Sequence, residues 1–267
     1  MRAARLVLAL AVAAAGGCGA TTGAAAQDSR LTWDQGGITR GPRSTLQLAL
    51  IFTGGEFAEG ASEILDALKA RGVKASFFVT GDFIRKPGFQ EHLRRMVAEG
   101  HYLGAHSDAH LLYAPWEDRG RTLVSEAEFR ADLEKNLAGL AQYGRTREQL
   151  RYFIPPYEWY NQQIADWAKA MGLVLFNYTP GTRSNADYML DTDPRFISSQ
   201  RIYESILEYE STHHDGLNGF LLLLHVGAGE GRTDKMHRYV APLVDELTRR
   251  GYRFLRVDQL LAGATAR

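Results

Sequence analysis

The chain repeats one unit, in which an amphipathic helix, a single glycine and a short apolar strand follow one another. Residues 62–71 predict the first such helix, Gly72 ends it, and 73–79 form the strand. The same order returns after the helices predicted at 91–99, 161–171 and 236–250. Glycine suits these junctions because it adopts the left-handed conformation that closes a helix. Repeated helix, glycine and strand predict a sheet of parallel strands covered by helices.

Polar residues follow several of these strands at the point where each strand ends. These residues are Glu56, His106, Tyr157, Asn177 and His225. Residues 219–224 are apolar on both faces, as expected of a strand that is covered on both sides. Only a sheet that curls toward closure brings five strand ends to one mouth. We therefore predict an α/β fold with a (β/α) barrel, distorted or incomplete.

The first residues have the pattern of an export signal, with Arg2 and Arg5 before an apolar stretch at 6–15. Cys18 follows Ala-Gly-Gly and predicts lipid anchoring as an exported lipoprotein; cleavage after Ala26, with release to the periplasm or medium, is the alternative. We expect three parts: a signal and tether at 1–26, an irregular lead-in at 27–45, and a barrel domain at 46–267.

Charge limits the partners of this chain. Lysine plus arginine and aspartate plus glutamate are both 31, so no net field attracts nucleic acid or an anionic membrane. A neutral substrate fits this balance. Membrane contact is expected only through the possible lipid anchor at Cys18.

His106 and His110 stand four residues apart just after the strand at 102–105. Two neutral imidazoles at this spacing can bind one divalent ion, for which zinc is the expected metal. Ser107 occupies the place where the His-Glu-x-x-His motif carries its base, so that motif is excluded. Glu56 is the nearest candidate for a third ligand or a base, and a solvated loop acid is the alternative.

Residues 73–110 read Val-Lys-Ala-Ser-Phe-Phe-Val-Thr-Gly-Asp, then a helix, then Glu-Gly-His-Tyr-Leu-Gly-Ala-His-Ser-Asp-Ala-His. This order closely resembles the polysaccharide deacetylase (NodB homology) domain of carbohydrate esterase family 4, and the resemblance extends over residues 46 to about 260. It implies a metal-dependent hydrolase that removes N- or O-linked acetyl groups from a carbohydrate at the bacterial cell envelope.

The resemblance also implies roles for single residues. His106 and His110 match the metal-ligand pair. His225, in Leu-Leu-His, matches the proton donor to the leaving group, and Leu223 the wall for the acetyl methyl. Tyr157, in Phe-Ile-Pro-Pro-Tyr, is implied to offer a backbone N–H to the oxyanion.

The groove motif around Tyr157 departs from the family at two positions. Ile154 replaces its arginine and Glu158 its glycine. Arg151 is the candidate to replace the missing cation. Trp159 is a candidate for stacking on a sugar ring, with packing inside a lid as the alternative.

The first motif departs most, because Thr53 and Gly54 stand where the family has its base and a metal-binding aspartate. Glu56 is the candidate replacement for both. The aspartate that orients the catalytic histidine is also displaced, which leaves Asp187, Asp191 and Asp193 as candidates. A non-catalytic surface protein that binds carbohydrate on a degenerate barrel is therefore the alternative function.

Overall fold

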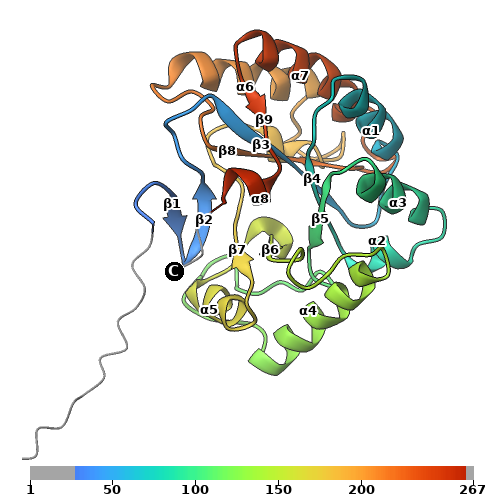
Figure 1. Ribbon diagram of the computed structural model, residues 1–267, viewed down its shortest axis with the longest axis vertical. Helices are drawn as coiled ribbons and strands as arrows, with labels where there is room; N and C mark the ends of the chain where they lie inside the picture. Colours follow the sequence, from blue (N-terminus) through green and yellow to red (C-terminus); the bar gives the residue numbers. More distant parts are fainter. Residues whose placement is uncertain (1–27, 263–267) are drawn as a thin grey trace, which may run out of the picture.

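A parallel sheet that curls around its own interior forms the centre of the molecule (Figure 1). The computed structural model describes residues 28–262, and within them the sheet has seven strands in the order β7-β6-β5-β4-β3-β8, with β9 paired to β3. The strands are β3 (Gln47–Gly54), β4 (Ser76–Val79), β5 (Tyr102–Ala105), β6 (Tyr152–Phe153), β7 (Val174–Leu175), β8 (Phe220–His225) and β9 (Arg253–Phe254). The prediction of a (β/α) barrel that is distorted or incomplete is thus confirmed.

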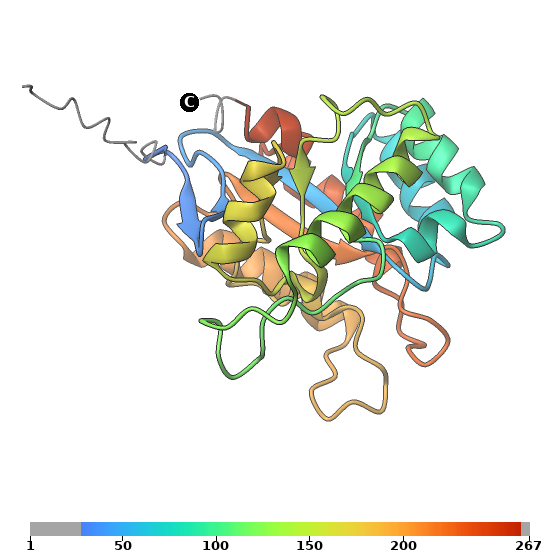
Figure 2. The same cartoon turned by 90° about the horizontal axis from the view of Figure 1, so that it is seen from below.

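Helices cover the outside of this sheet (Figures 1 and 2). They are α1 (Ala61–Ala70), α2 (Gly81–Arg85), α3 (Gln90–Ala98), α4 (Glu126–Ala141), α5 (Gln162–Ala170), α6 (Ser199–Thr212), α7 (Val240–Arg249) and α8 (Val257–Leu260), with short 3-10 turns η1 (Pro156–Glu158), η2 (Ser184–Ala186) and η3 (Met236–Tyr239). The glycines predicted to end four of them, Gly72, Gly100, Gly172 and Gly251, all have positive φ. The repeated glycines therefore mark helix ends, as their conformational freedom predicts.

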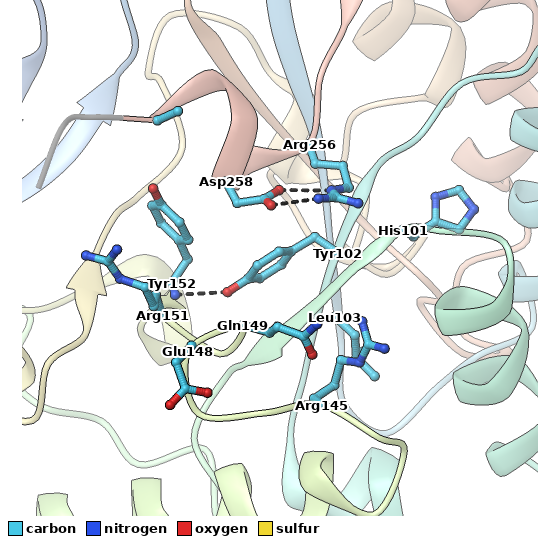
Figure 3. A pocket seen from close by; sticks show the side chains of 11 residues that line it. His101, Tyr102, Leu103, Arg145, Glu148, Gln149, Arg151, Tyr152, Arg256 and Asp258 are labelled. Carbon is cyan, nitrogen blue, oxygen red and sulfur yellow. Dashed lines mark hydrogen bonds and ion pairs between the residues drawn. The ribbon is translucent and has the colours of Figure 1, made fainter. Parts of the chain in front are cut away.

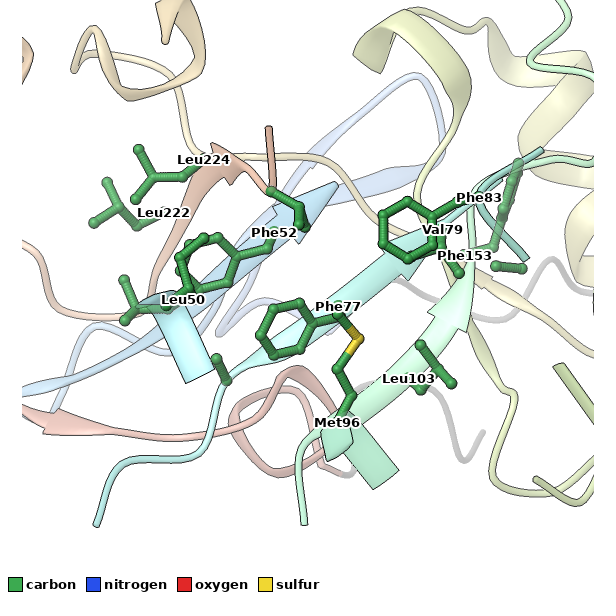
Figure 4. Close-up of a cluster of buried hydrophobic side chains, with 14 of the residues drawn as sticks. Leu50, Phe52, Phe77, Val79, Phe83, Met96, Leu103, Phe153, Leu222 and Leu224 are labelled. Carbon is green, nitrogen blue, oxygen red and sulfur yellow. The ribbon is translucent and has the colours of Figure 1, made fainter. Parts of the chain in front are cut away.

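Successive residues of each strand alternate between two apolar clusters, because side chains along a strand point to opposite faces. The outer cluster, between sheet and helices, includes Leu50, Phe52, Phe77 and Leu222 (Figure 4). The inner cluster fills the curled sheet and includes Ala49, Ile51, Phe78, Tyr102, Leu221 and Leu223. By the same alternation, Thr53, His106 and His225 continue the inner face at the carboxyl ends of β3, β5 and β8.

A hairpin from the lead-in segment narrows the opening between the two sides of the sheet. Its strands are β1 (Thr32–Asp34) and β2 (Gly37–Arg40). Asn177 N donates to Ile38 O at 2.7 Å beside β7, and Gly41 N donates to Gly219 O at 2.7 Å beside β8. The expectation that 27–45 is irregular is corrected here, since two strands in it are held by partners far along the chain.

The predicted export signal, Cys18 and the last residues of the predicted domain lie outside the described part of the chain. Within residues 28–262, no helix has the length and apolar character needed to cross a bilayer. The division into signal, lead-in and domain stays a prediction.

Candidate functional site

Three histidines meet at the carboxyl edge of the sheet. His106 directly follows β5 and His225 ends β8, where it stands opposite Thr53 of β3. Burial, together with the charges of His110 and His225, holds the pKa of His106 well below its usual value. Burial, and then the charge of His225, lower the pKa of His110 to about 4. β5 and β8 are parallel strands of one sheet, so His106 and His225 stand at the same edge of it. The lowered pKa values leave His106 and His110 neutral at pH 7, the form that binds metals.

The geometry of the pair suits a shared ligand. His106 Nδ1 lies 2.9 Å from the carbonyl oxygen of Ile154, so this nitrogen donates and Nε2 is left as the acceptor. The rings of His106 and His110 are 5.0 Å apart at their centroids. Ser107 and His110 have φ values of 68° and 53°, a conformation that L-residues seldom adopt. Backbone strain of this kind is typical of functional loops.

Asp132 of α4 fixes the loop that carries the pair. Its carboxylate accepts hydrogen bonds from Ser107 Oγ at 2.6 Å, Asp108 N at 3.0 Å and Ala109 N at 2.7 Å. The loop therefore depends on a helix 25 residues further along the chain.

Asp108 is a buried acid with its own partners. It pairs with Arg85 at 2.6 Å and with Lys135 at 2.7 Å. Burial alone would raise its pKa, but the hydrogen bonds from these two cations leave the pKa of Asp108 below its usual value. Asp108 is thus engaged in ion pairs rather than offered to a ligand.

Glu56 does not join the two histidines. The loop after β3 leaves its side chain exposed, where it lines an open cavity of about 420 Å³ with Asp82, Arg85 and Lys86. Among residues 28–262, no three histidine, cysteine or acidic side chains gather as a metal site. This corrects the expectation that Glu56 completes a three-ligand site with His106 and His110. Its use as a base stays a prediction.

The residues at this edge of the sheet offer few ligands to a divalent ion. Two neutral imidazoles supply nitrogen ligands. Thr53, where the family has an acid, has a buried Oγ1 with no hydrogen-bond partner in the described chain. The two imidazoles are one ligand short of the three that catalytic zinc sites carry, so an ion here would need water or substrate in the place of the third.

Asp187 is the acid that orients His225. Its Oδ1 lies 2.6 Å from His225 Nδ1, and its Oδ2 accepts from His225 N at 2.8 Å. Burial alone would lower the pKa of His225, but the charge and hydrogen bond of Asp187 leave that pKa raised. The other candidates bond elsewhere, Asp191 to Thr233 and Asp193 to Arg195. Sequence alone left the three open, and the fold selects the first.

Tyr157 and Glu158 form a strained turn after β6, with φ values of 57° and 52°. The Tyr157 ring lies 4.3 Å from that of His110 between centroids and is 46% exposed, so it borders the site and faces solvent. Trp116, 54% exposed, contacts Tyr157 on the same side. An aromatic rim therefore flanks the histidines.

The three predicted substrate-binding residues have different surroundings. Trp159 is half-buried, donates to Pro115 O at 3.1 Å and packs beneath the Arg119 guanidinium. Leu223 is fully buried in the inner cluster, on the same face of β8 as His225. For both, contact with substrate stays a prediction.

Arg151 does not reach the site. It stands just before β6, at the opposite edge of the sheet, and lines a cavity of about 410 Å³ with Tyr102, Tyr152 and Asp258 (Figure 3). This corrects the expectation that Arg151 replaces the missing groove arginine. Arg151 precedes β6, whereas the histidines lie near the carboxyl end of that strand.

Glu158 is a site residue that the sequence interpretation noted only as a replaced glycine. Asn177 Nδ2 donates to its carbonyl oxygen at 2.7 Å and anchors the turn. Burial raises the pKa of Glu158 to about 7, with a lowering effect from His225 and a raising effect from Asp187. The sequence signal that could have identified Glu158 is the position of an acid directly after the Phe-Ile-Pro-Pro-Tyr motif.

Comparison with known proteins adds to this geometry. The family model described as polysaccharide deacetylase matches residues 31–176. A peptidoglycan-N-acetylglucosamine deacetylase of Bacillus cereus is 25% identical over 224 residues, which cover 82% of this chain and 70% of the relative. A Listeria monocytogenes relative described by the same activity is also 25% identical, and the match spans 39% of that longer protein.

Solved structures share the fold. A family 4 carbohydrate esterase of Bacillus subtilis gives a TM-score of 0.68 at 20% identity and 85% coverage of both chains. A family 4 pseudoenzyme of Bacillus anthracis gives a TM-score of 0.63 at 19% identity, covering 86% of this chain and 70% of that one. At such identities the likeness concerns the fold alone.

Proposed function

The chain belongs to the polysaccharide deacetylase family, and we propose that it is a metal-dependent hydrolase that removes N- or O-linked acetyl groups from a carbohydrate. The observation that carries the proposal is the Asp187–His225 pair at the end of β8, on the same edge of the sheet as the neutral imidazoles of His106 and His110. In this arrangement His225 is the proton donor, and His106 and His110 are the ligands for a divalent ion.

In this proposal His106 and His110 hold the ion, with zinc expected. A bound ion of this kind supplies a Lewis acid that polarises a carbonyl and acidifies water. Asp187 occupies Nδ1 of His225, so Nε2 is the atom left to carry a proton to the departing sugar nitrogen or oxygen. The backbone N–H of Tyr157 stabilises the oxyanion, Leu223 walls the acetyl methyl, and Trp159 contacts the sugar.

The cell envelope is the proposed place of action. The export pattern at 1–26 supports it, with lipid attachment at Cys18 or release as the two routes. The relatives named for peptidoglycan support an envelope polymer as the substrate.

The test measures acetate release and sugar binding separately for the zinc-loaded native protein and His225→Ala. Acetylated chitooligosaccharides, acetylated xylan and peptidoglycan serve as substrates. We expect His225→Ala to lose at least about 100-fold in acetate release while it still binds sugar, because proton donation contributes that much. Equal release by both proteins contradicts the assigned role of His225.

A second function is favoured by one observation, the replacement of the family's first acids by Thr53 and Gly54. On this alternative the barrel binds carbohydrate without turnover. Sugar binding by the native protein with no acetate release from any of the three substrates supports this alternative and contradicts the hydrolase.

A further inference from the structure

Hydrolysis needs a group that accepts a proton from the attacking water, and β3 does not provide one. Its last residues, Thr53 and Gly54, carry no carboxylate, and a hydroxyl is a poor base at neutral pH. Glu56, further along, has an exposed side chain in an open cavity whose lining includes none of the three histidines. An acid whose charge acts on His225 is therefore the stronger candidate for the acceptor.

Glu158 has the placement that this role requires. It lies in the left-handed turn at Tyr157 and Glu158, which Asn177 anchors and whose Tyr157 ring is 4.3 Å from the His110 ring between centroids. The Glu158 side chain is half-buried there, and its charge acts on His225. Asp108, Asp132 and Asp187 all accept hydrogen bonds from side chains or backbone. In the described chain no group donates a hydrogen bond to the Glu158 carboxylate, which leaves its oxygens available to water.

We propose that Glu158 is the general base of this site and replaces, from the turn after β6, the acid that β3 lacks. The inference rests on the proposed deacetylase function. The Glu158 carboxylate takes one proton from water as the water oxygen bonds to the acetyl carbonyl carbon. His225 gives its Nε2 proton to the sugar nitrogen or oxygen as the bond from that atom to the carbonyl carbon breaks. Acetate leaves, Glu158 returns its proton to solvent, and His225 takes one up.

The groups around Glu158 determine when this can occur. His225 of β8, Asp187 after η2 and Tyr178 after β7 are the titratable groups whose charges interact with it. Because its pKa is about 7, the basic form increases as the pH rises through neutrality. His225 has to stay protonated, so activity falls again above the raised pKa of His225. A bell-shaped pH profile follows.

Glu158→Gln tests the proposal, since it keeps the shape and removes the base. We expect kcat to fall at least about 100-fold with little change in KM, and the rising limb near neutral pH to disappear. Glu148→Gln is the matched control at the opposite edge of the sheet, where it lines the cavity of Figure 3 and should leave the profile unchanged. Glu158→Asp should keep the rising limb at reduced kcat.

A second readout does not depend on turnover. Titration of the His225 ring by NMR should give a lower pKa in Glu158→Gln than in the native protein, because a nearby carboxylate favours the imidazolium. Two results would overturn the assignment to Glu158 and leave the deacetylase proposal standing. One is an active native protein whose Glu158→Gln variant keeps its kcat and its rising limb. The other is a pKa of His225 that is the same in Glu158→Gln as in the native protein. If the native protein releases no acetate, the deacetylase proposal fails and the base assignment fails with it.

Discussion

At the scale of single residues, the partners of each acid decide what it can do. Asp108 is neutralised by two cations, and Asp187 is bound to an imidazole. The side-chain carboxylate of Glu158 accepts no hydrogen bond within residues 28–262. All three lie on loops around one site. Residue type alone could not separate them, because the distinguishing contacts come from elements far along the chain.

The first prediction concerns Asp187→Asn. Asp187 raises the pKa of His225 by charge and hydrogen bond, so its removal should lower that pKa. The acid form of His225 is then lost at lower pH, and the falling limb of acetate release should move to lower pH. NMR titration of the imidazole together with the pH profile measures both effects. An unmoved falling limb contradicts the role given to Asp187.

The second prediction concerns the imidazole pair. His106→Ala and His110→Ala should each abolish stoichiometric zinc binding, measured by calorimetry on metal-free protein, with the far-ultraviolet circular dichroism spectrum unchanged. His214→Ala is the control, because that side chain is fully exposed on the surface. If both variants bind zinc as tightly as the native protein does, His106 and His110 are not the zinc ligands.

At the scale of elements, the sequence predicted well those features that depend on local pattern. Ser125 and Glu128, three residues apart, form a capping box at the start of α4, and the predicted glycine-ended helices are present. The hairpin β1–β2 was not predicted, because its strands are short and are held by residues beside β7 and β8. Asp132 was not predicted for a similar reason. Its three hydrogen bonds go to the histidine loop, far from α4 in the sequence, and no local pattern indicates them.

The third prediction tests the link between α4 and the loop. Asp132→Ala removes three hydrogen bonds and should lower the free energy of unfolding by about 1–3 kcal/mol, measured by urea denaturation. Zinc affinity should fall as well, since the loop positions both imidazoles. Asp166→Ala on α5, an exposed acid bonded only to Gln162, should change neither quantity. Unchanged zinc affinity in Asp132→Ala would show that the loop holds its conformation without α4.

At the scale of the whole molecule, the barrel and the family were both predictable, since repeated strand ends and ordered motifs are properties of the chain as a whole. The segments after β5, β7 and β8 extend as loops from one side of the molecule (Figure 2). The identity of the base and the fate of Glu56 and Arg151 were not predictable. They depend on which side chains face the mouth once the sheet has curled.

The fourth prediction concerns closure of the barrel. Arg40 of β2 is buried and donates to Asn218 O at 2.9 Å and to Gly216 O at 2.8 Å next to β8. Arg40→Met leaves these carbonyls without their donor and should lower the free energy of unfolding by about 2–3 kcal/mol, measured by urea denaturation. Arg43→Met, at an exposed ion pair, should cost less than about 1 kcal/mol. Equal losses in the two variants would contradict a closing role for β2.

The most direct test of the hydrolase itself is the amount of acetate released per protein molecule from acetylated oligosaccharides, before and after chelation of the metal. The three-histidine site predicts many turnovers by the zinc-loaded protein, loss of release after chelation, and recovery when zinc is restored. Sugar binding without any acetate from chitooligosaccharides, xylan or peptidoglycan, in protein shown to contain zinc, would contradict the account.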